Sequence, residues 1–229
     1  MNDVLVPNAL PAVDPGAVRL AVVGESGAIE EASWRHCIPQ GHGYAGEHWQ
    51  NRQLVTRDRC NLCGSQQWVE CPTPFVGESG RLLNDLLRAS GLPRERVWCG
   101  NVSRRPLAEH EKTLEYVRPL LPRLAIDLEA FAPNCVLVLG NLALAAFLGD
   151  GKSVTNWRGS VVMGELEGVP YRCAVALHPA AVLREPSQLA LLRWDVKRAV
   201  DEAACNTLKV TPRFVWLPRE DGLKREPVR

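Results

Sequence analysis

The sequence predicts an α/β fold, in which a mainly parallel central sheet lies between two layers of helices as a three-layer sandwich. Short apolar runs alternate with longer segments whose leucines recur at helical spacing, as in repeated β-α units. Polar residues follow several of these runs, at the strand ends where open parallel sheets bind ligands. A stretch rich in cysteine and histidine interrupts the pattern and predicts an insert stapled by a metal ion.

The first predicted strands flank the insert and one helix. Arg19–Val23 (RLAVV) is the first strand, and it ends in the turn Gly24–Gly27. Ser79–Gly91 carries leucines at positions 82, 83, 86 and 87 between a capping residue type and a terminal glycine, so it predicts an amphipathic helix. Val97–Val102 (VWCGNV) is the second strand.

The next segment predicts a helical region followed by a buried strand. Thr113–Phe131 has a helical pattern, which Pro119 and Pro122 are expected to kink or split because proline lacks the backbone N–H. Cys135–Gly140 (CVLVLG) is apolar throughout, as in a parallel strand covered on both faces. Asn141–Leu148 predicts another helix.

The last predicted elements complete one domain. Val161–Leu177 predicts a hairpin-like pair of strands that turns near Gly164–Gly168, and Gln188–Ala204 predicts a closing helix. We therefore expect a single domain over residues 1–204, interrupted by the insert at about 34–73, and a C-terminal tail over 205–229 that frays near its end.

Composition limits the class of protein. The chain has 229 residues, of which 46% are hydrophobic and 23% charged, typical of one globular α/β domain and too short for a multidomain machine. No apolar stretch approaches the roughly 20 residues that span a bilayer, and the acidic, proline-containing start does not resemble an export signal. We expect a cytoplasmic monomer. The net charge of +1 means that any basic surface for nucleic acid must be local.

The insert holds a candidate metal site. Cys60 and Cys63 form a Cys-x-x-Cys pair, and Cys37 and Cys71 can complete a tetrahedral zinc shell. A relocated iron–sulfur cluster and no metal at all remain alternatives. Three histidines could replace either outer cysteine: His36, His42 and His48. Four cysteines lie in strand or helix patterns and are expected to be buried hydrophobic residues: Cys99, Cys135, Cys173 and Cys205.

Six blocks along the chain carry a family resemblance. In order they are GESGAIEE, PFVGESGRLLNDLL, CGNVSRRP, VLVLGNLALAAFLG, WRG and HPAAVLRE. Together they resemble the uracil-DNA glycosylase superfamily, and most closely its bacterial and phage-type branches, called families four and five. The resemblance covers Arg19–Ala204 apart from the insert, and it implies a uracil-DNA glycosylase-like fold and DNA as the partner.

The resemblance implies an enzyme that takes a pyrimidine out of the DNA stack and releases it. Phe75 would stack on the base, and the amide of Asn101 would read its edge, because an amide can match a carbonyl and an N–H together. His178 would hydrogen-bond the leaving base, on which negative charge develops.

The expected water-binding loop departs from the family pattern Gly-Glu-x-Pro-Gly. Here Gly24 and Glu25 are followed by Ser26, where some relatives place an acid or an amide. We expect Gly24 and Ser26 to line the base pocket. Glu25, Glu30 and Glu31 are candidates to orient water or to stabilise the cationic sugar, and the competing role is pairing with a helix N-terminus.

Further residues are candidates for DNA contacts. Leu183 and Arg184 follow His178 and resemble the family's wedge segment, since apolar wedges pry base steps apart. Arg104, Arg105 and Arg158 could contact phosphates, with solvent-exposed arginine as the competing role.

Family four carries a four-iron cluster. The resemblance implies that its ligands would be a Cys-x-x-Cys ahead of the first motif, one cysteine just after the Asn101 strand and one on the next helix. None of these places holds a cysteine here: Ser103, Arg104 and Arg105 follow the strand, and Val117 lies where the helix cysteine would fall. The inherited cluster site is therefore absent from the sequence.

The leading functional prediction is a monofunctional DNA glycosylase with uracil as the default base. A bulky hypermodified or glucosylated pyrimidine of phage DNA, removed in antiviral defence, is the main alternative. A non-catalytic DNA-binding module is a second alternative, and a zinc nuclease is disfavoured because four thiolates close the zinc shell. No lysine accompanies the motif residues, so we expect the DNA strand to stay intact.

Overall fold

The computed structural model describes residues 18–28 and 73–205 with their side chains, and elsewhere the backbone of seven short strands. Five of these strands lie in the region of the predicted insert: β2 (Trp34–Cys37), β3 (Gly43–Ala45), β4 (Glu47–Gln50), β5 (Gln53–Thr56) and β6 (Trp68–Glu70). They pair into one three-stranded and one two-stranded antiparallel sheet. The sequence of this region shows no lasting strand pattern, so these strands were not expected.

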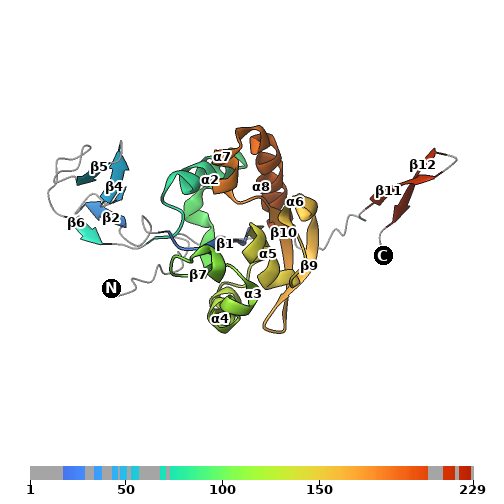
Figure 1. Ribbon diagram of the computed structural model, residues 1–229, viewed down its shortest axis with the longest axis horizontal. Helices are drawn as coiled ribbons and strands as arrows, with labels where there is room; N and C mark the ends of the chain where they lie inside the picture. The colour runs from blue at the N-terminus through green and yellow to red at the C-terminus, as the bar shows by residue number, and fades with distance from the viewer. Residues whose placement is uncertain are drawn as a thin grey trace.

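A five-stranded sheet in the order β7-β1-β8-β10-β9 forms the centre of the fold (Figure 1). Its first four members run parallel, and β9 is an antiparallel edge strand. The strands are β1 (Leu20–Ser26), β7 (Trp98–Ser103), β8 (Cys135–Leu139), β9 (Val161–Leu166) and β10 (Val169–Ala176). Every residue of β7 and β8 is buried, as expected for strands covered on both faces.

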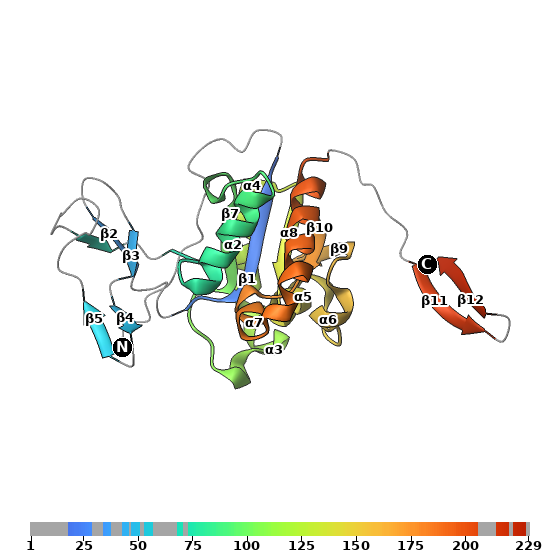
Figure 2. The same cartoon turned by 90° about the horizontal axis from the view of Figure 1, so that it is seen from above.

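Helices cover both faces of this sheet. On one face α8 packs against β1, β8 and β10, and α2 packs against α7 and α8; on the other, α4 packs against β7 and α5 against β1, β7, β8 and β9 (Figures 1 and 2). The α-helices are α2 (Glu78–Ala89), α3 (Leu114–Val117), α4 (Leu121–Phe131), α5 (Asn141–Leu148), α6 (Val154–Trp157), α7 (Pro179–Arg184) and α8 (Leu189–Ala203). Short 3₁₀ turns are η1 (Arg94–Arg96), η2 (Glu109–Glu111), η3 (Arg118–Leu120) and η4 (Pro186–Gln188). The predicted three-layer α/β fold is confirmed.

The leucine pattern of α2 explains its place in the fold. Leu83, Leu86 and Leu87 are buried, while Arg81 and Arg88 are exposed on the opposite side. Burying a leucine contributes about 1.5–3 kcal/mol to folding, so one face of the helix is fixed against the core.

Two local predictions are confirmed, and the structure gives the physical reason for each. The helical stretch around Pro119 is split, because α3 ends at Val117, a 3₁₀ turn follows, and α4 begins at Leu121. The β9–β10 hairpin turns at Glu167 and Gly168, whose φ angles of 49° and 81° fit a two-residue turn with both central residues left-handed.

The predicted tail contains two strands that the sequence analysis did not expect. They are β11 (Phe214–Arg219) and β12 (Gly222–Pro227), which pair antiparallel. The division into a domain at 1–204 and a tail at 205–229 stays a prediction. Within the described part of the chain, no helix is long and apolar enough to cross a membrane.

Candidate active site

The carboxyl ends of three strands bring the predicted site residues together. Gly24 of β1 lies beside Asn101 of β7 in the parallel register, and the pairing continues to Ser26 and Ser103. His178 follows β10 and begins α7. A cavity of about 490 Å³ opens at the carboxyl ends of β1, β8 and β10, and Asn101 on β7 lines a separate cavity. The described lining residues of the first cavity are Glu25, Ser26, Glu109, Lys112, Gly140, Asn141, Leu142, Val154, Leu177, His178, Ala180, Ala181 and Arg184.

The structure fixes His178 as a hydrogen-bond donor. Its Nδ1 accepts a hydrogen bond from the backbone N–H of Ala180 at 3.2 Å, as the N-cap of α7, and Pro179 occupies the first position of that helix. Burial lowers the pKa of His178 below 6.5; Glu25 opposes this shift, and the positive charges of Arg184 and Lys112 add to it. The imidazole is therefore neutral near pH 7, and its proton lies on Nε2.

Gly24 lets two side chains approach the end of β1. A Cβ atom at Gly24 would lie 2.4 Å from Oδ1 of Asn101 and 2.6 Å from Cζ of Phe75. Asn101 is 4% exposed, and its Oδ1 makes no hydrogen bond within the described part of the chain. A buried unpaired carbonyl costs about 1–3 kcal/mol, which a ligand with an N–H at this point would recover.

Phe75 has a strained backbone at the site. Its φ is +58°, a left-handed conformation that a bulky residue rarely adopts and that costs about 1–3 kcal/mol. The ring is 2% exposed and lies 6.4 Å from the imidazole of His178 between centroids, at 30° between planes. Strain of this kind persists only where the surroundings hold it, and it gathers at functional sites.

Glu25 joins the end of β1 to a helix N-terminus. Its Oε1 accepts a hydrogen bond from the backbone N–H of Leu142 at 3.1 Å, in the first turn of α5. Gly140, with φ of +89°, permits this approach, since a Cβ there would lie 2.4 Å from the same oxygen. The N-terminus of α5 stabilises the carboxylate of Glu25. Pairing with a helix N-terminus, the competing role expected for this residue, is therefore present, and the helix is α5. Glu25 also lines the cavity.

Comparison with known proteins decides the family. The family model for the uracil DNA glycosylase superfamily matches residues 62–204, more than half of the chain. The chain belongs to this superfamily. The resemblance predicted from the six blocks is therefore confirmed.

Three relatives in the superfamily are named type-4 uracil-DNA glycosylases. The chain is 34% identical over 130 residues to that of Archaeoglobus fulgidus, 32% over 123 residues to that of Pyrobaculum aerophilum and 36% over 119 residues to that of Thermotoga maritima. The matched segments cover 55%, 52% and 50% of this chain, and 65%, 63% and 59% of the relatives' own lengths. The chain thus spans less than two thirds of each relative.

Three arginines predicted as DNA contacts form ion pairs with their own chain. Arg104 pairs with Asp127 at 2.6 Å, and Arg105 pairs with Glu111 at 3.1 Å. Arg158 forms a two-pronged pair with the buried carboxylate of Asp195. The structure favours a structural role for Arg158 over the predicted phosphate contact, because losing it would leave Asp195 buried and unpaired.

The predicted wedge lies beside the cavity. Arg184 lines it, and Leu183 on the same short helix α7 is 43% exposed. Glu30 and Glu31 lie outside the described residues.

The structure also adds a residue that the sequence analysis missed. Lys112 lines the cavity, so the expectation that no lysine accompanies the motif residues is wrong. Its ammonium lies 2.5 Å from a carboxylate oxygen of Glu109. The only feature of the sequence that pointed to Lys112 was its place in a polar loop after β7.

An iron–sulfur cluster does not fit the described residues at the place that family four implies. After β7, Arg104 and Arg105 are held by carboxylates and Ser103 bonds the carbonyl of Arg105. None of these groups is a thiolate, the ligand that iron–sulfur clusters require. The described cysteines form no disulfide with one another, and the described residues include no cluster of three or more side chains that could hold a metal ion. The predicted zinc ligands Cys37, Cys60, Cys63 and Cys71 lie outside the described side chains.

Proposed function

We propose that this chain is a monofunctional DNA glycosylase that extrudes a pyrimidine, with uracil as first choice, and hydrolyses its N-glycosidic bond to leave an abasic site. The observation that carries the proposal is a pair of groups at the carboxyl ends of two strands of the same parallel sheet, β7 and β10. One is the buried amide of Asn101 with an unpartnered Oδ1, and the other is the neutral imidazole of His178. The names of the relatives support the same activity.

Asn101 and Phe75 would recognise the extruded base. The edge of uracil presents an N–H beside a carbonyl, which complements Oδ1 and Nδ2 of one amide. Phe75 offers an aromatic face, and stacking of this kind is typical of enzymes that act on a flipped base. Because the Phe75 ring is 2% exposed, a base that stacks on it has to displace the groups that cover it.

His178 would stabilise the leaving group. When the N-glycosidic bond breaks, its electron pair goes to the base, and negative charge develops on the base oxygens. The Nε2–H of His178 can donate to such an oxygen without transferring its proton, because the neutral imidazole is a very weak acid. Donors of this kind act on the transition state more than on the bound substrate.

Glu25 would act on the sugar side of the bond. A carboxylate at the cavity wall can stabilise the cationic sugar and orient the water that attacks C1′, and the proton released by that water returns to solvent. Arg184 and Lys112 would attract the phosphates beside the flipped nucleotide. Leu183 would fill the gap left in the duplex.

A second substrate class has one supporting observation. Several residues along the cavity wall are small, including Ser26, Gly140, Ala180 and Ala181. Small side chains leave room for a substituent on the ring that neither Asn101 nor Phe75 senses. A hypermodified or glucosylated pyrimidine of phage DNA is therefore the second candidate, with antiviral defence as its role.

The test is a panel of duplexes that carry one uracil, unmodified bases only, or phage-derived modified pyrimidines. The proposal predicts abasic sites in the uracil duplex, detected as alkali-labile breaks. Abasic sites only in the modified DNA would favour the second candidate. DNA binding without abasic sites in any duplex would favour the non-catalytic alternative.

A further inference from the structure

Arg94 holds the loop that carries Phe75. From η1 its guanidinium donates hydrogen bonds to the backbone carbonyls of Pro74 at 2.6 Å and Phe75 at 3.3 Å. The same group donates to Oδ1 of Asn84 on α2 at 3.2 Å. The loop is thus tied to the helix that follows it.

The contacts of Arg94 fall on the strained residue of the site. Phe75 has a φ of +58°, and relaxation to a more common conformation would turn its carbonyl away from the guanidinium. The planar fork of arginine can serve several acceptors at fixed angles, which an ammonium group cannot do. The guanidinium carbon also lies 5.9 Å from the centroid of the Phe75 ring, within the range of a cation–π contact.

The loop that carries Phe75 packs closely against Gly80 in the first turn of α2. A Cβ atom at Gly80 would lie 1.8 Å from the carbonyl oxygen of Phe75, so the first turn of α2 packs directly on this peptide. Arg94 bonds the same oxygen. The backbone of Phe75 is therefore enclosed between a helix and a guanidinium.

We propose that Arg94 is a positioning residue, which holds Phe75 in the left-handed conformation that aims its ring at the base. The inference rests on the proposed function and adds a residue to it. Within the described part of the chain, neither Arg94 nor Phe75 lines the cavity of His178, and the link from Arg94 to the site is its hydrogen bonds to the backbone of Pro74 and Phe75. No sequence motif marks this role.

A double-mutant cycle separates this role from general stability. The variants are Phe75→Ala, Arg94→Met and their combination, and Arg88→Met on the exposed side of α2 is the matched control. Single-turnover base release and inhibition by free uracil are measured for each. Arg94→Met should lower the rate about a hundredfold, as expected when a catalytic geometry is displaced by about 1 Å, and should weaken inhibition by uracil.

The double variant should be no slower than Phe75→Ala alone, because Arg94 has no ring left to position. Arg94→Lys should recover only part of the rate, and Arg88→Met should match the wild type. Additive losses in the cycle, or a wild-type rate for Arg94→Met, would overturn the proposal.

A crystal structure of Arg94→Met gives a readout that does not depend on activity. We expect Phe75 to leave the left-handed region, and an unchanged φ would overturn the positioning role. If the wild type released no base from any DNA, the proposed function would fail, and this structure alone would decide the role of Arg94.

Discussion

At the residue scale, the site depends on how closely β1 and β7 approach at Gly24. Gly24→Ala would place a Cβ atom 2.4 Å from the Asn101 amide and 2.6 Å from the Phe75 ring, so both groups would have to move. Overpacking of this kind costs about 1–3 kcal/mol of stability. We expect a folded variant whose single-turnover rate of base release falls about a hundredfold. Gly77→Ala, where no atom lies within 4 Å, is the control and should match the wild type. An active Gly24→Ala enzyme would show that neither residue touches the base.

His178 also sets a pH dependence. Its pKa in the folded protein is lowered below 6.5 by burial, and the neutral form is the one whose Nδ1 accepts from Ala180. The contribution of His178 to the rate should therefore be constant above pH 6.5 and should fall as the pH drops through the lowered pKa. The unfolded chain binds the proton more readily, so acid below pH 6.5 should also reduce the free energy of unfolding. Rate and thermal unfolding profiles of the wild type and His178→Asn check this. A rate that rises on acidification would contradict a neutral donor.

The sequence predicted part of this site. Gly24, Asn101 and His178 follow apolar strands in a parallel sheet, so their meeting at one edge could be expected. The strain at Phe75 and the clamp by Arg94 could not, because φ angles and contacts between residues 19 positions apart leave no local pattern. The pairing of Arg158 with Asp195 was hidden for the same reason, across 37 positions.

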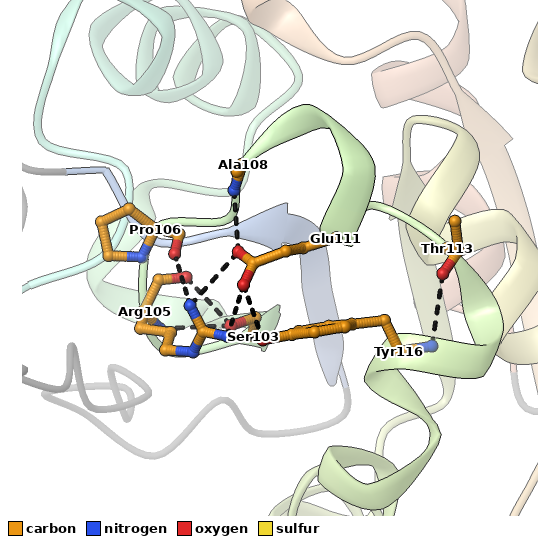
Figure 3. Close-up of polar contacts among 7 residues, drawn as sticks. All are labelled: Ser103, Arg105, Pro106, Ala108, Glu111, Thr113 and Tyr116. Carbon is orange, nitrogen blue, oxygen red and sulfur yellow. Dashed lines mark hydrogen bonds and ion pairs between the residues drawn. The ribbon is translucent and has the colours of Figure 1, made fainter.

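At the element scale, the loop between β7 and α3 is held by a polar network. Arg105 donates to both carboxylate oxygens of Glu111, and the hydroxyl of Tyr116 donates to Glu111 at 2.6 Å (Figure 3). The same carboxylate accepts from the backbone N–H of Ala108 at 2.9 Å. These bonds, led by that from Arg105, lower the pKa of Glu111 to about 2. The network therefore stays charged above pH 4.5 and weakens only as the pH falls toward about 2.

Glu111→Gln should loosen this loop and leave the sheet intact. The neutral amide keeps the shape but loses the ion pair, so we expect faster hydrogen exchange at Ala108 and its neighbours and little change in exchange of the β7 and β8 amides. Glu115→Gln, an exposed acid nearby, is the matched control. Exchange rates equal to those of the wild type would show that the loop does not need the network.

The secondary structure elements were predictable where periodicity was strong. The leucines of α2 and the apolar runs of β7 and β8 indicated their elements directly. The strands β2–β6, β11 and β12 were missed because they are short or contain a proline; Pro218 lies inside β11 and Pro227 ends β12, and proline argues against a strand.

At the scale of the whole molecule, the predicted zinc site remains to be tested. We expect about one zinc per chain, since Cys37, Cys60, Cys63 and Cys71 offer four thiolates for a tetrahedral shell. Cys60→Ser should lose the metal, and Cys205→Ser should keep it. Elemental analysis of the purified proteins is the measurement. Iron with sulfide, or no metal, would contradict the prediction.

The most direct test of the proposed glycosylase activity is the release of free base from a duplex with a single uracil. We expect one free uracil for each abasic site, in a strand that breaks only after alkali. We also expect a rate about a hundredfold lower for His178→Asn, which retains an acceptor for Ala180, with DNA affinity unchanged. Release at the wild-type rate by His178→Asn, or no release by the wild type, would contradict it.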